Sequence, residues 1–242
     1  MLRLDRVTKR YGVGVFGGTT FTAVRDVSFE VAPGEVVSLI GESGSGKSTI
    51  GKMILKLIPV SEGTITLDGT DIREFSRGRR KEYYRNVQGV FQDPFSCYNP
   101  VFKADRVLRM IKEEYFPRVG RAEWDERVAA ALERFGLAGL ADRPAHLLSG
   151  GEKQLLAIAS VTVLEPACIV FDEPTTALDL RNRRRTWAVV ASLPQQAVVV
   201  THDLEAITGF DRALLFDGGR IVFDGPPAAA VEEYLALLDE PL

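Results

Sequence analysis

Residues 41–48 read GESGSGKS and fit the pattern GxxxxGK(S/T) at every fixed position. The β-branched apolar run VVSLI precedes them at residues 36–40, and residues 49–57 follow with apolar side chains at helical spacing. This context predicts a glycine-rich turn between a buried strand and the start of a helix. Backbone N–H groups in such a turn can point inward at phosphate oxygens, and the positive end of the helix dipole favours the same anion.

The side chains of this segment fit a nucleoside triphosphate. Gly41, Gly44 and Gly46 let the backbone curl around a phosphate. Lys47 can reach the β- and γ-phosphates, and the Ser48 hydroxyl can bind Mg²⁺. We expect the whole segment to bind nucleotide, together with four neighbouring residues: Glu42, Ser43, Ser45 and Thr49. A glycine-rich surface turn is the alternative, but such a turn requires neither the flanking strand nor the flanking helix.

Length and composition limit the possible architectures. At 242 residues, the chain is long enough for one large α/β domain with an appended subdomain and too short for two domains of typical size. A hydrophobic content of 45% and a charged content of 26% are ordinary for a globular protein. The net charge of −3 argues against a nucleic-acid partner, and we interpret the local basic run RGRRK at residues 77–81 as a solvated loop.

No feature of the sequence indicates secretion or a membrane span. Cys97 and Cys168 are far apart and lack metal-type spacing, so we expect neither a disulfide framework nor a zinc site, and a reducing compartment fits. Residues 1–10 are charged and contain no apolar signal-peptide core. No apolar run approaches the roughly 20 residues that a bilayer requires. If the protein serves a membrane, we expect it to do so from outside the lipid.

The hydrophobic pattern predicts strands first and helices later. Early strands, which look antiparallel and meander-like, are expected at residues 2–7, 22–31, 63–67 and 87–91, with a flexible excursion at 12–20. From Asp93, with Pro94, Asn99 and Pro100 as breakers, the pattern changes to a helical insert with helices at 104–114, 123–135 and 152–162. The later elements are a strand at 168–171, a helix at 181–192, a strand at 197–201, a short helix at 204–209, a hairpin of 213–216 and 220–223, and a helix at 227–238.

Two acidic residues follow one of the buried strands. Asp172 and Glu173 come directly after the run CIVF, at the carboxyl end of the strand, where ligands of open α/β sheets bind. Asp172 can hold Mg²⁺ directly or through water, and Glu173 can polarise an attacking water as a general base. Solvated turn residues are the alternative, and the phosphate loop in the same chain favours the catalytic interpretation.

Three further side chains stand at strand ends. His202 follows the strand AVVVT and can stabilise charge on a γ-phosphate. Gln92 ends the strand at 87–91 and can orient water or the Mg²⁺ shell. Tyr11, after the first strand, can stack on an adenine ring. Each of them alone would be an ordinary surface residue, so these assignments depend on the neighbouring motifs.

A second anion-binding element, SGGE, occupies residues 149–152. Ser149 stands at a helix-cap position, Gly150 and Gly151 expose backbone N–H groups, and Glu152 follows in the first helical turn. One nucleotide does not need two phosphate-binding elements that lie far apart in sequence. We therefore expect this element to serve a nucleotide held by a partner copy.

Together these motifs resemble the nucleotide-binding subunits of ABC transporters over essentially the whole chain. GESGSGKS resembles the family's Walker A motif, CIVFDE its Walker B motif with the following glutamate, and LLSGGEKQ at residues 147–154 its signature. Gln92 resembles the Q-loop, His202 the switch histidine, Tyr11 the adenine-stacking aromatic, and the run Ala177, Leu178, Asp179 the D-loop. The resemblance implies a P-loop α/β fold of ABC type with an antiparallel β subdomain, a mainly parallel core sheet and a helical subdomain.

The resemblance also implies an organisation and a mechanism. It implies one ATPase domain: an α/β core at 1–92 and 163–225, a helical subdomain at 93–162, and a short C-terminal helix at 226–242. Two such subunits, identical or different, would meet head to tail and enclose ATP and Mg²⁺ between one chain's Walker A and the other's signature, with Asp179 at the same interface. Hydrolysis would reopen the dimer and drive integral membrane subunits from the cytoplasmic face of the cell membrane.

Finer resemblance divides the chain near residues 117–121. Before this seam, FQDPFSCYNP at 91–100 and the excursion at 12–20 resemble ATPases of oligopeptide and dipeptide importers. After it, LSGGEKQLLAIASV, DEPTTALDLRNRRR and VVVTHDLEAI resemble energy-coupling-factor ATPases of vitamin and metal uptake. Seven of the eight lysines lie before residue 118, leaving only Lys153 after it. We therefore hypothesise a chimera of two subfamilies, natural or engineered.

Two alternatives to a transporter ATPase remain. One is a soluble ABC protein of DNA repair or translation, which a long coiled coil or a second tandem ATPase domain would indicate; the sequence contains neither pattern. The other is a folded ATP-binding module with weak or uncoupled turnover, because the presence of Lys47, Glu173 and His202 does not prove their alignment. The transported solute, peptide-like or vitamin or metal, is not encoded in this chain.

Overall fold

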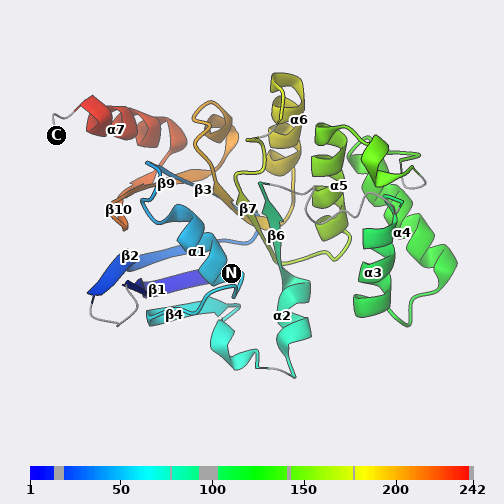
Figure 1. Cartoon of the computed structure of the whole chain (residues 1–242), viewed down its shortest axis with the longest axis horizontal. Helices are drawn as coiled ribbons and strands as arrows, with labels where there is room; N and C mark the ends of the chain where they lie inside the picture. The colour runs from blue at the N-terminus through cyan, green and yellow to red at the C-terminus, as the bar shows by residue number, and fades with distance from the viewer. Residues whose placement is uncertain (14–18, 77, 93–102, 141–142, 177, 240–242) are drawn as a thin grey trace.

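The computed structural model describes residues 1–13, 19–76, 78–92, 103–140, 143–176 and 178–239. Their strands form two sheets, one of four strands in the order β2-β1-β4-β5 and one of six in the order β10-β9-β3-β8-β7-β6 (Figure 1). The expected P-loop α/β fold, with an antiparallel sheet beside a mainly parallel one, is therefore confirmed. Some of the expectations concerned residues that lie outside the described ones, namely Asp93, Pro94, Cys97, Asn99 and Pro100.

The four-stranded sheet contains the early strands. Its members are β1 (Leu2–Val13), β2 (Thr19–Val31), β4 (Glu62–Leu67) and β5 (Thr70–Asp71). β1 pairs antiparallel with both β2 and β4, and Leu2, Leu4 and Val7 point into the core. The antiparallel expectation is correct for these strands. Both β1 and β2 are longer than expected, so residues 12–13 and 19–20 of the expected flexible excursion belong to strands. Residues 14–18 are not described.

The six-stranded sheet positions the functional residues. Its members are β3 (Val36–Gly41), β6 (Val87–Phe91), β7 (Cys168–Asp172), β8 (Gln196–Val200), β9 (Arg212–Asp217) and β10 (Arg220–Gly225). All neighbours are parallel except the final hairpin of β9 and β10. The expectation of an antiparallel strand at 87–91 is wrong, because β6 runs parallel to β7. The long helical connection between these two strands is the crossover that parallel pairing requires.

Seven α-helices are described: α1 (Lys47–Ile54), α2 (Arg80–Asn86), α3 (Arg106–Tyr115), α4 (Arg121–Arg134), α5 (Gly150–Thr162), α6 (Leu180–Ala191) and α7 (Pro227–Asp239). Arg80 and Lys81 of the basic run form the first turn of α2, so the interpretation of these two residues as a loop is wrong. Tyr83 anchors this short helix, since its buried hydroxyl donates to the carbonyl of Ile54. The short helix expected at 204–209 is a 3-10 turn, η4 (Ala206–Gly209), and two further 3-10 turns are η1 (Ile72–Glu74) and η3 (Ala145–Leu147).

Two apolar clusters cover the two faces of the six-stranded sheet, because alternate residues of a strand point to opposite faces. In β3, Val37 and Leu39 join the cluster that contains α1 and the four-stranded sheet. Val36 and Ile40 join the cluster that contains buried residues of α3 to α7. Cys168 is buried in the first cluster, and burial raises the pKa of its thiol to about 12. Among the described residues, no helix is both long and apolar enough to cross a bilayer.

Candidate functional site

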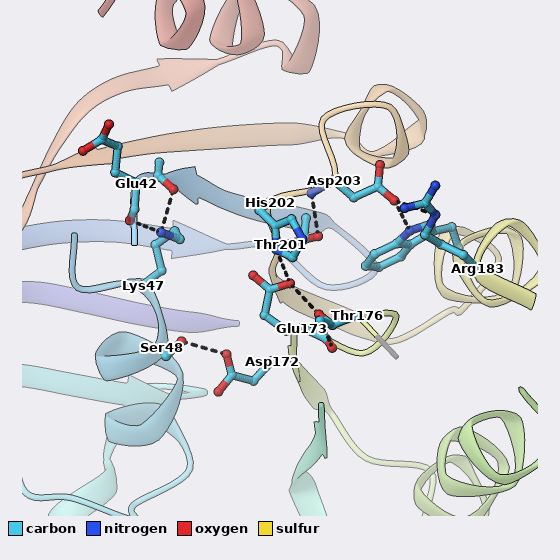
Figure 2. A network of polar contacts seen from close by, with 12 residues as sticks. Glu42, Lys47, Ser48, Asp172, Glu173, Thr176, Arg183, Thr201, His202 and Asp203 are labelled. Atoms are coloured by element: carbon cyan, nitrogen blue, oxygen red, sulfur yellow. Dashed lines mark hydrogen bonds and ion pairs between the residues drawn. The ribbon is translucent and has the colours of Figure 1, made fainter. Parts of the chain in front are cut away.

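The carboxyl ends of three adjacent parallel strands gather most of the candidate residues. β3 leads into the phosphate loop, β7 ends at Asp172, and β8 lies between them and leads to His202. A side chain at the end of one strand is therefore close to those at the ends of its neighbours, which is where α/β sheets bind ligands. Figure 2 shows Lys47 turned toward Glu42, Ser48 meeting Asp172, and His202 meeting Glu173 at this edge.

The phosphate loop has a backbone that only glycine permits at two positions. Gly41 and Gly46 have φ angles of 132° and 103°. A Cβ on Gly41 would lie 2.1 Å from the carbonyl oxygen of Phe216, and one on Gly46 would lie 2.5 Å from that of Ala23. Gly46 is also the N-cap of α1 and provides no side-chain cap, so the first N–H groups of the helix stay available. These features fit a phosphate group at the helix N-terminus.

Lys47 curls back over the loop. Its Nζ donates to the carbonyl oxygens of Gly41 and Glu42 at 2.8 and 2.6 Å and to Ser45 Oγ at 3.1 Å. Burial lowers the pKa of Lys47, and nearby carboxylates, Glu173 foremost, oppose that shift. All three direct acceptors are uncharged. A phosphate anion would supply the counter-charge that this buried ammonium lacks in direct contact.

Ser48 and Asp172 meet across the loop. The Ser48 hydroxyl donates to Asp172 Oδ1 at 2.9 Å. A hydroxyl and a carboxylate at one point form a set of hard oxygen ligands, which is the type that Mg²⁺ prefers. The two residues come from α1 and β7, far apart in sequence, and both were expected to bind the metal. Their donor set therefore fits a magnesium ion.

Glu173 and His202 form a close pair. His202 Nδ1 lies 2.8 Å from Glu173 Oε2, and the Thr176 hydroxyl donates to the same oxygen at 3.3 Å. Glu173 has a φ of 51°, and its N–H donates to the carbonyl of Val200 at 3.0 Å. A left-handed backbone at a non-glycine residue costs about 1–3 kcal/mol, and such strain clusters at functional sites. The turn that holds it aims the carboxylate along the sheet edge.

Tyr11 and Gln92 come from different sheets. Tyr11 is 37% exposed on β1, and Lys9 Nζ lies 5.0 Å from the centroid of its ring. Its exposed ring can accept a stacked base. Gln92 is exposed directly after β6, the strand beside β7.

The second anion-binding element is a capped helix start. Ser149 Oγ accepts from the N–H of Glu152 at 3.2 Å, and Glu152 Oε2 accepts from the N–H of Ser149 at 2.7 Å, which is a capping box. The expected cap position is therefore confirmed. In Figure 1, α5 and α1 stand apart, on opposite sides of β6 and β7. The element does not face the chain's own phosphate loop.

A contact between α5 and α6 was not predictable from the motifs. A Cβ on Gly151 would lie 2.3 Å from Cγ of Asn182, so glycine is needed where α5 passes this side chain. Asn182 in turn donates its backbone and side-chain N–H groups to the two carboxylate oxygens of Asp179, both at 2.8 Å. Asp179 is the N-cap of α6. The start of α5 thus packs closely against Asn182, whose hydrogen bonds go to Asp179. Ala177, expected in the same motif, lies outside the described residues.

Replacing Ser149 by alanine should lower the free energy of unfolding by about 1 kcal/mol, because it removes the side-chain half of the capping box. The pKa of Glu152 is lowered by its hydrogen bond from the Ser149 backbone and further by the Ser149 side chain. The stabilisation from this carboxylate is present above its ordinary pKa of 4.5 and is lost as the pH falls through the lowered value. Urea unfolding at several pH values measures both effects. The difference in the free energy of unfolding between the wild type and Ser149→Ala should become smaller at acid pH. Glu152→Gln is the control, because its side-chain oxygen can still accept the hydrogen bond from the Ser149 N–H, and it should lower the free energy of unfolding less than Ser149→Ala does. Equal stability of Ser149→Ala and the wild type at neutral pH would contradict the prediction.

Comparison with known proteins gives a consistent set of relatives. A family model described as ABC transporter matches residues 24–176. The chain is 42% identical to an ABC transporter ATP-binding protein of Deinococcus radiodurans, over 82% of this chain and 84% of the relative. It is 38% identical to the biotin transport ATP-binding protein BioM of Rhizobium etli, over 83% and 86%. It is 35% identical to the oligopeptide transport ATP-binding protein OppF of Haemophilus influenzae, over 81% of this chain and 61% of that longer protein.

Two solved structures share the architecture. The dimeric ATP-binding cassette MJ0796 in a post-hydrolysis state, bound to ADP and Pi, has a TM-score of 0.81 and 27% identity, with 94% of this chain and 99% of that chain covered. The protein cbiO1 of Clostridium perfringens, part of the transporter complex cbiONQ, has a TM-score of 0.83 and 26% identity, with 98% and 93% covered. The likeness therefore extends over almost the whole length of each chain.

Proposed function

Since this chain belongs to the ABC transporter family, we propose that it hydrolyses ATP at a head-to-tail dimer interface and so drives transport through separate membrane subunits. It is an ATP-binding subunit with the ATPase domain of that family. The observation that carries the proposal is the convergence of the Lys47 loop, the Ser48–Asp172 pair and the Glu173–His202 pair at one sheet edge. Each supplies a different part of phosphoryl-transfer chemistry.

ATP binding would use groups already aimed at the loop. The glycine-rich backbone and the N-terminus of α1 would bind the β-phosphate, and Lys47 Nζ would exchange some of its carbonyl partners for phosphate oxygens. The exposed ring of Tyr11 would stack on adenine. Ser48 and Asp172, with Gln92 beside them, would hold Mg²⁺, which neutralises charge on the β- and γ-phosphates.

Hydrolysis would use the Glu173–His202 pair. Glu173 Oε2 would accept a proton from a water whose oxygen forms the new bond to the γ-phosphorus as the bond to the ADP oxygen breaks. His202, 2.8 Å away through Nδ1, would hold this carboxylate in place and stabilise charge on the transferred group. The turn at Glu173 fixes the direction of the carboxylate before substrate arrives.

A second subunit would complete each site. The Ser149 element is a capped helix start that lies on the other side of β6 and β7 from α1, which supports a role at a partner's nucleotide. MJ0796, a similar cassette, is dimeric in its ADP- and Pi-bound structure. Asp179, held through Asn182 to the same helix start, would lie at this interface. Both a homodimer and a heterodimer satisfy this arrangement.

The membrane partner and the solute are the finer part of the proposal. A similar protein, cbiO1, is part of a transporter complex, which supports work at the inner face of the cell membrane beside integral subunits. Relatives of both subfamilies, BioM and OppF, match more than four fifths of the chain, so both alignments cross residues 117–121. The chimera stays a hypothesis, and separate comparison of residues 1–117 and 122–242 tests it.

Two variants that are each inactive should regain activity when mixed. Lys47→Ala removes the loop cation, and Ser149→Arg blocks the signature, so each homodimer would have two damaged sites. In a head-to-tail heterodimer, the Walker A of one variant meets the signature of the other, and one intact site results. Mg-ATP hydrolysis by an equimolar mixture should exceed the sum of the separate variants severalfold and should reach about a quarter of the wild-type rate, because about half of the dimers are mixed and each mixed dimer has one intact site of two.

Matched controls distinguish this model from its alternatives. A mixture of Lys47→Ala with the double variant Lys47→Ala/Ser149→Arg contains no intact site and should stay inactive. Thermal unfolding of each variant should show a folded protein. Wild type that hydrolyses ATP without any recovery in the mixture would contradict the composite site, and wild type that binds ATP without turnover would favour the uncoupled ATP-binding module.

A further inference from the structure

Asp203, the residue after His202, is held by α6 and η4. Its Oδ2 accepts a hydrogen bond from Trp187 Nε1 at 3.0 Å and lies 3.5 Å from Arg183 Nε, and its Oδ1 accepts from the N–H of Ala206 at 3.3 Å. The carboxylate is only 14% exposed. Figure 2 shows it turned away from Glu173 and toward α6. Its contacts therefore lie behind the sheet edge and not in the phosphate site.

Main-chain bonds fix the segment on both sides of His202. The N–H of Thr201 donates to the carbonyl of Leu39 in β3 at 3.3 Å, and Thr201 itself is 1% exposed. The N–H of Asp203 donates to Thr201 Oγ1 at 3.1 Å. Residues 201–203 are thus hydrogen-bonded to β3 through Thr201 and contact α6 through the Asp203 carboxylate.

His202 has no comparable support of its own. Its side chain is 67% exposed, and its Nδ1 contacts Glu173 Oε2. A fixed backbone sets the position and direction of the His202 Cα–Cβ bond, and the contact with Glu173 then selects one rotamer of the imidazole. The backbone is fixed by Thr201 and by Asp203. The distance between His202 Nδ1 and Glu173 therefore depends on the contacts of Asp203.

Trp187 makes this support rigid. Its side chain is buried, and its indole ring packs edge to face on Phe210 with centroids 5.8 Å apart. Trp187 and Arg183 are one helical turn apart on α6, which places both donors on the same face toward Asp203. The helix begins at its N-cap Asp179, the residue expected at the dimer interface. One rigid helix thus joins that interface to the histidine segment.

We propose that Asp203 is a positioning residue: together with Arg183 and Trp187, it holds His202 against Glu173 and links this pair to the start of α6 at Asp179. The inference rests on the proposed ATPase function and deepens it. The Asp203 carboxylate touches neither substrate nor the reacting atoms. A displacement of α6 at a dimer interface would move His202 through this contact, so the geometry of the His202–Glu173 pair would respond to the partner.

The test compares Asp203→Asn in two backgrounds. In the otherwise wild-type chain, this substitution removes the charge that faces Arg183, and the turnover number for Mg-ATP should fall about tenfold while KM for ATP changes less than about twofold. In a His202→Ala background, Asp203→Asn should cause no further fall, because its effect passes through the imidazole. Single-turnover measurements with labelled ATP can quantify the slow hydrolysis that is expected of the His202→Ala variants. A general loss of stability would lower activity in both backgrounds.

Two further variants keep the test decisive. Trp187→Phe retains the buried ring and removes only the indole donor, and we expect a fall of about threefold that also vanishes in the His202→Ala background. It replaces Asp203→Asn if that variant does not fold. Asp224→Asn is the matched control, because it breaks another Arg–Asp pair, with Arg212, far from the site and should leave turnover unchanged.

The outcomes separate the inference from the proposed function. Wild type without Mg-ATP hydrolysis would overturn the function. Active wild type with an equally active Asp203→Asn variant, or with losses that add to those of His202→Ala, would overturn the positioning role alone. Equal falls in turnover for Asp203→Asn and Asp224→Asn would also overturn it, since the effect would then be one of stability.

Discussion

Turnover of Mg-ATP by Glu173→Gln is expected to be about a thousandfold below that of the wild type, with ATP affinity nearly unchanged. A general base contributes roughly 10²- to 10⁴-fold to a rate, and glutamine cannot accept the proton of the attacking water. The amide keeps the size of the side chain and can still bond to His202 and Thr176, which contact the carboxylate at 2.8 and 3.3 Å. Binding geometry should therefore persist while the chemical step stops. Under the proposed mechanism the dimer reopens only after hydrolysis, so this variant should also accumulate as an ATP-bound dimer in size-exclusion chromatography.

Glu165→Gln is the control for this prediction. Glu165→Gln is the same chemical change at a residue with the same unusual φ of 51° as Glu173, but Glu165 lies on the surface and pairs with Arg127. It should hydrolyse ATP at the wild-type rate. If Glu173→Gln retained more than about a tenth of wild-type turnover, Glu173 would not be the general base, and another group or the phosphate itself would have to take the proton.

Lys47→Ala should weaken ATP binding by at least about a hundredfold, which corresponds to about 3 kcal/mol. The Nζ of Lys47 is buried among neutral acceptors at 2.6 to 3.1 Å, so its positive charge is poorly solvated until an anion reaches it. Hydrogen bonds to charged groups contribute about 1.5–3 kcal/mol each, and Lys47 is aimed to make more than one. Isothermal titration with ATP measures the loss directly.

Stability of the Lys47→Ala protein should change little or rise. Burial is the largest influence on the pKa of Lys47 and lowers it, which means that the fold disfavours the charge that the residue carries at neutral pH. Lys52, exposed on the same helix, provides the control, and Lys52→Ala should bind ATP as the wild type does. An unchanged ATP affinity in Lys47→Ala would contradict the assignment of the phosphate loop.

The sequence predicted much of this molecule because its motifs have local causes. GESGSGKS requires a strand before it and a helix after it, and both are present as β3 and α1. The ends of buried strands indicated Asp172, Glu173 and His202, since parallel strands bring their carboxyl ends to one edge. The fold class and the family were predictable for the same reason. Which of these residues perform chemistry stays a prediction until the variants are measured.

Features that depend on distant contacts were not predictable. β6 pairs parallel with β7 because a long helical connection brings it back, and its own five residues carry no sign of that direction. α2 depends on a hydrogen bond from Tyr83 to a helix far earlier in the chain. The contact of Gly151 with Asn182 and that of Asp203 with α6 likewise join segments whose separate sequences reveal no partner. Such contacts follow from packing, which periodicity does not encode.

The order of strands in the large sheet has a consequence for dividing this chain. β3, from the first part of the chain, is hydrogen-bonded on both sides to strands from the last part, β8 and β9, and β6 lies against β7. Cutting the chain between α3 and α4 would therefore yield two fragments, and each would have an incomplete sheet with exposed strand edges. Neither fragment should fold by itself, whereas both expressed together can complement each other by inserting β3 between its neighbours. Any exchange of segments between related proteins must for the same reason preserve side-chain fit along three separate strand boundaries rather than at a single junction.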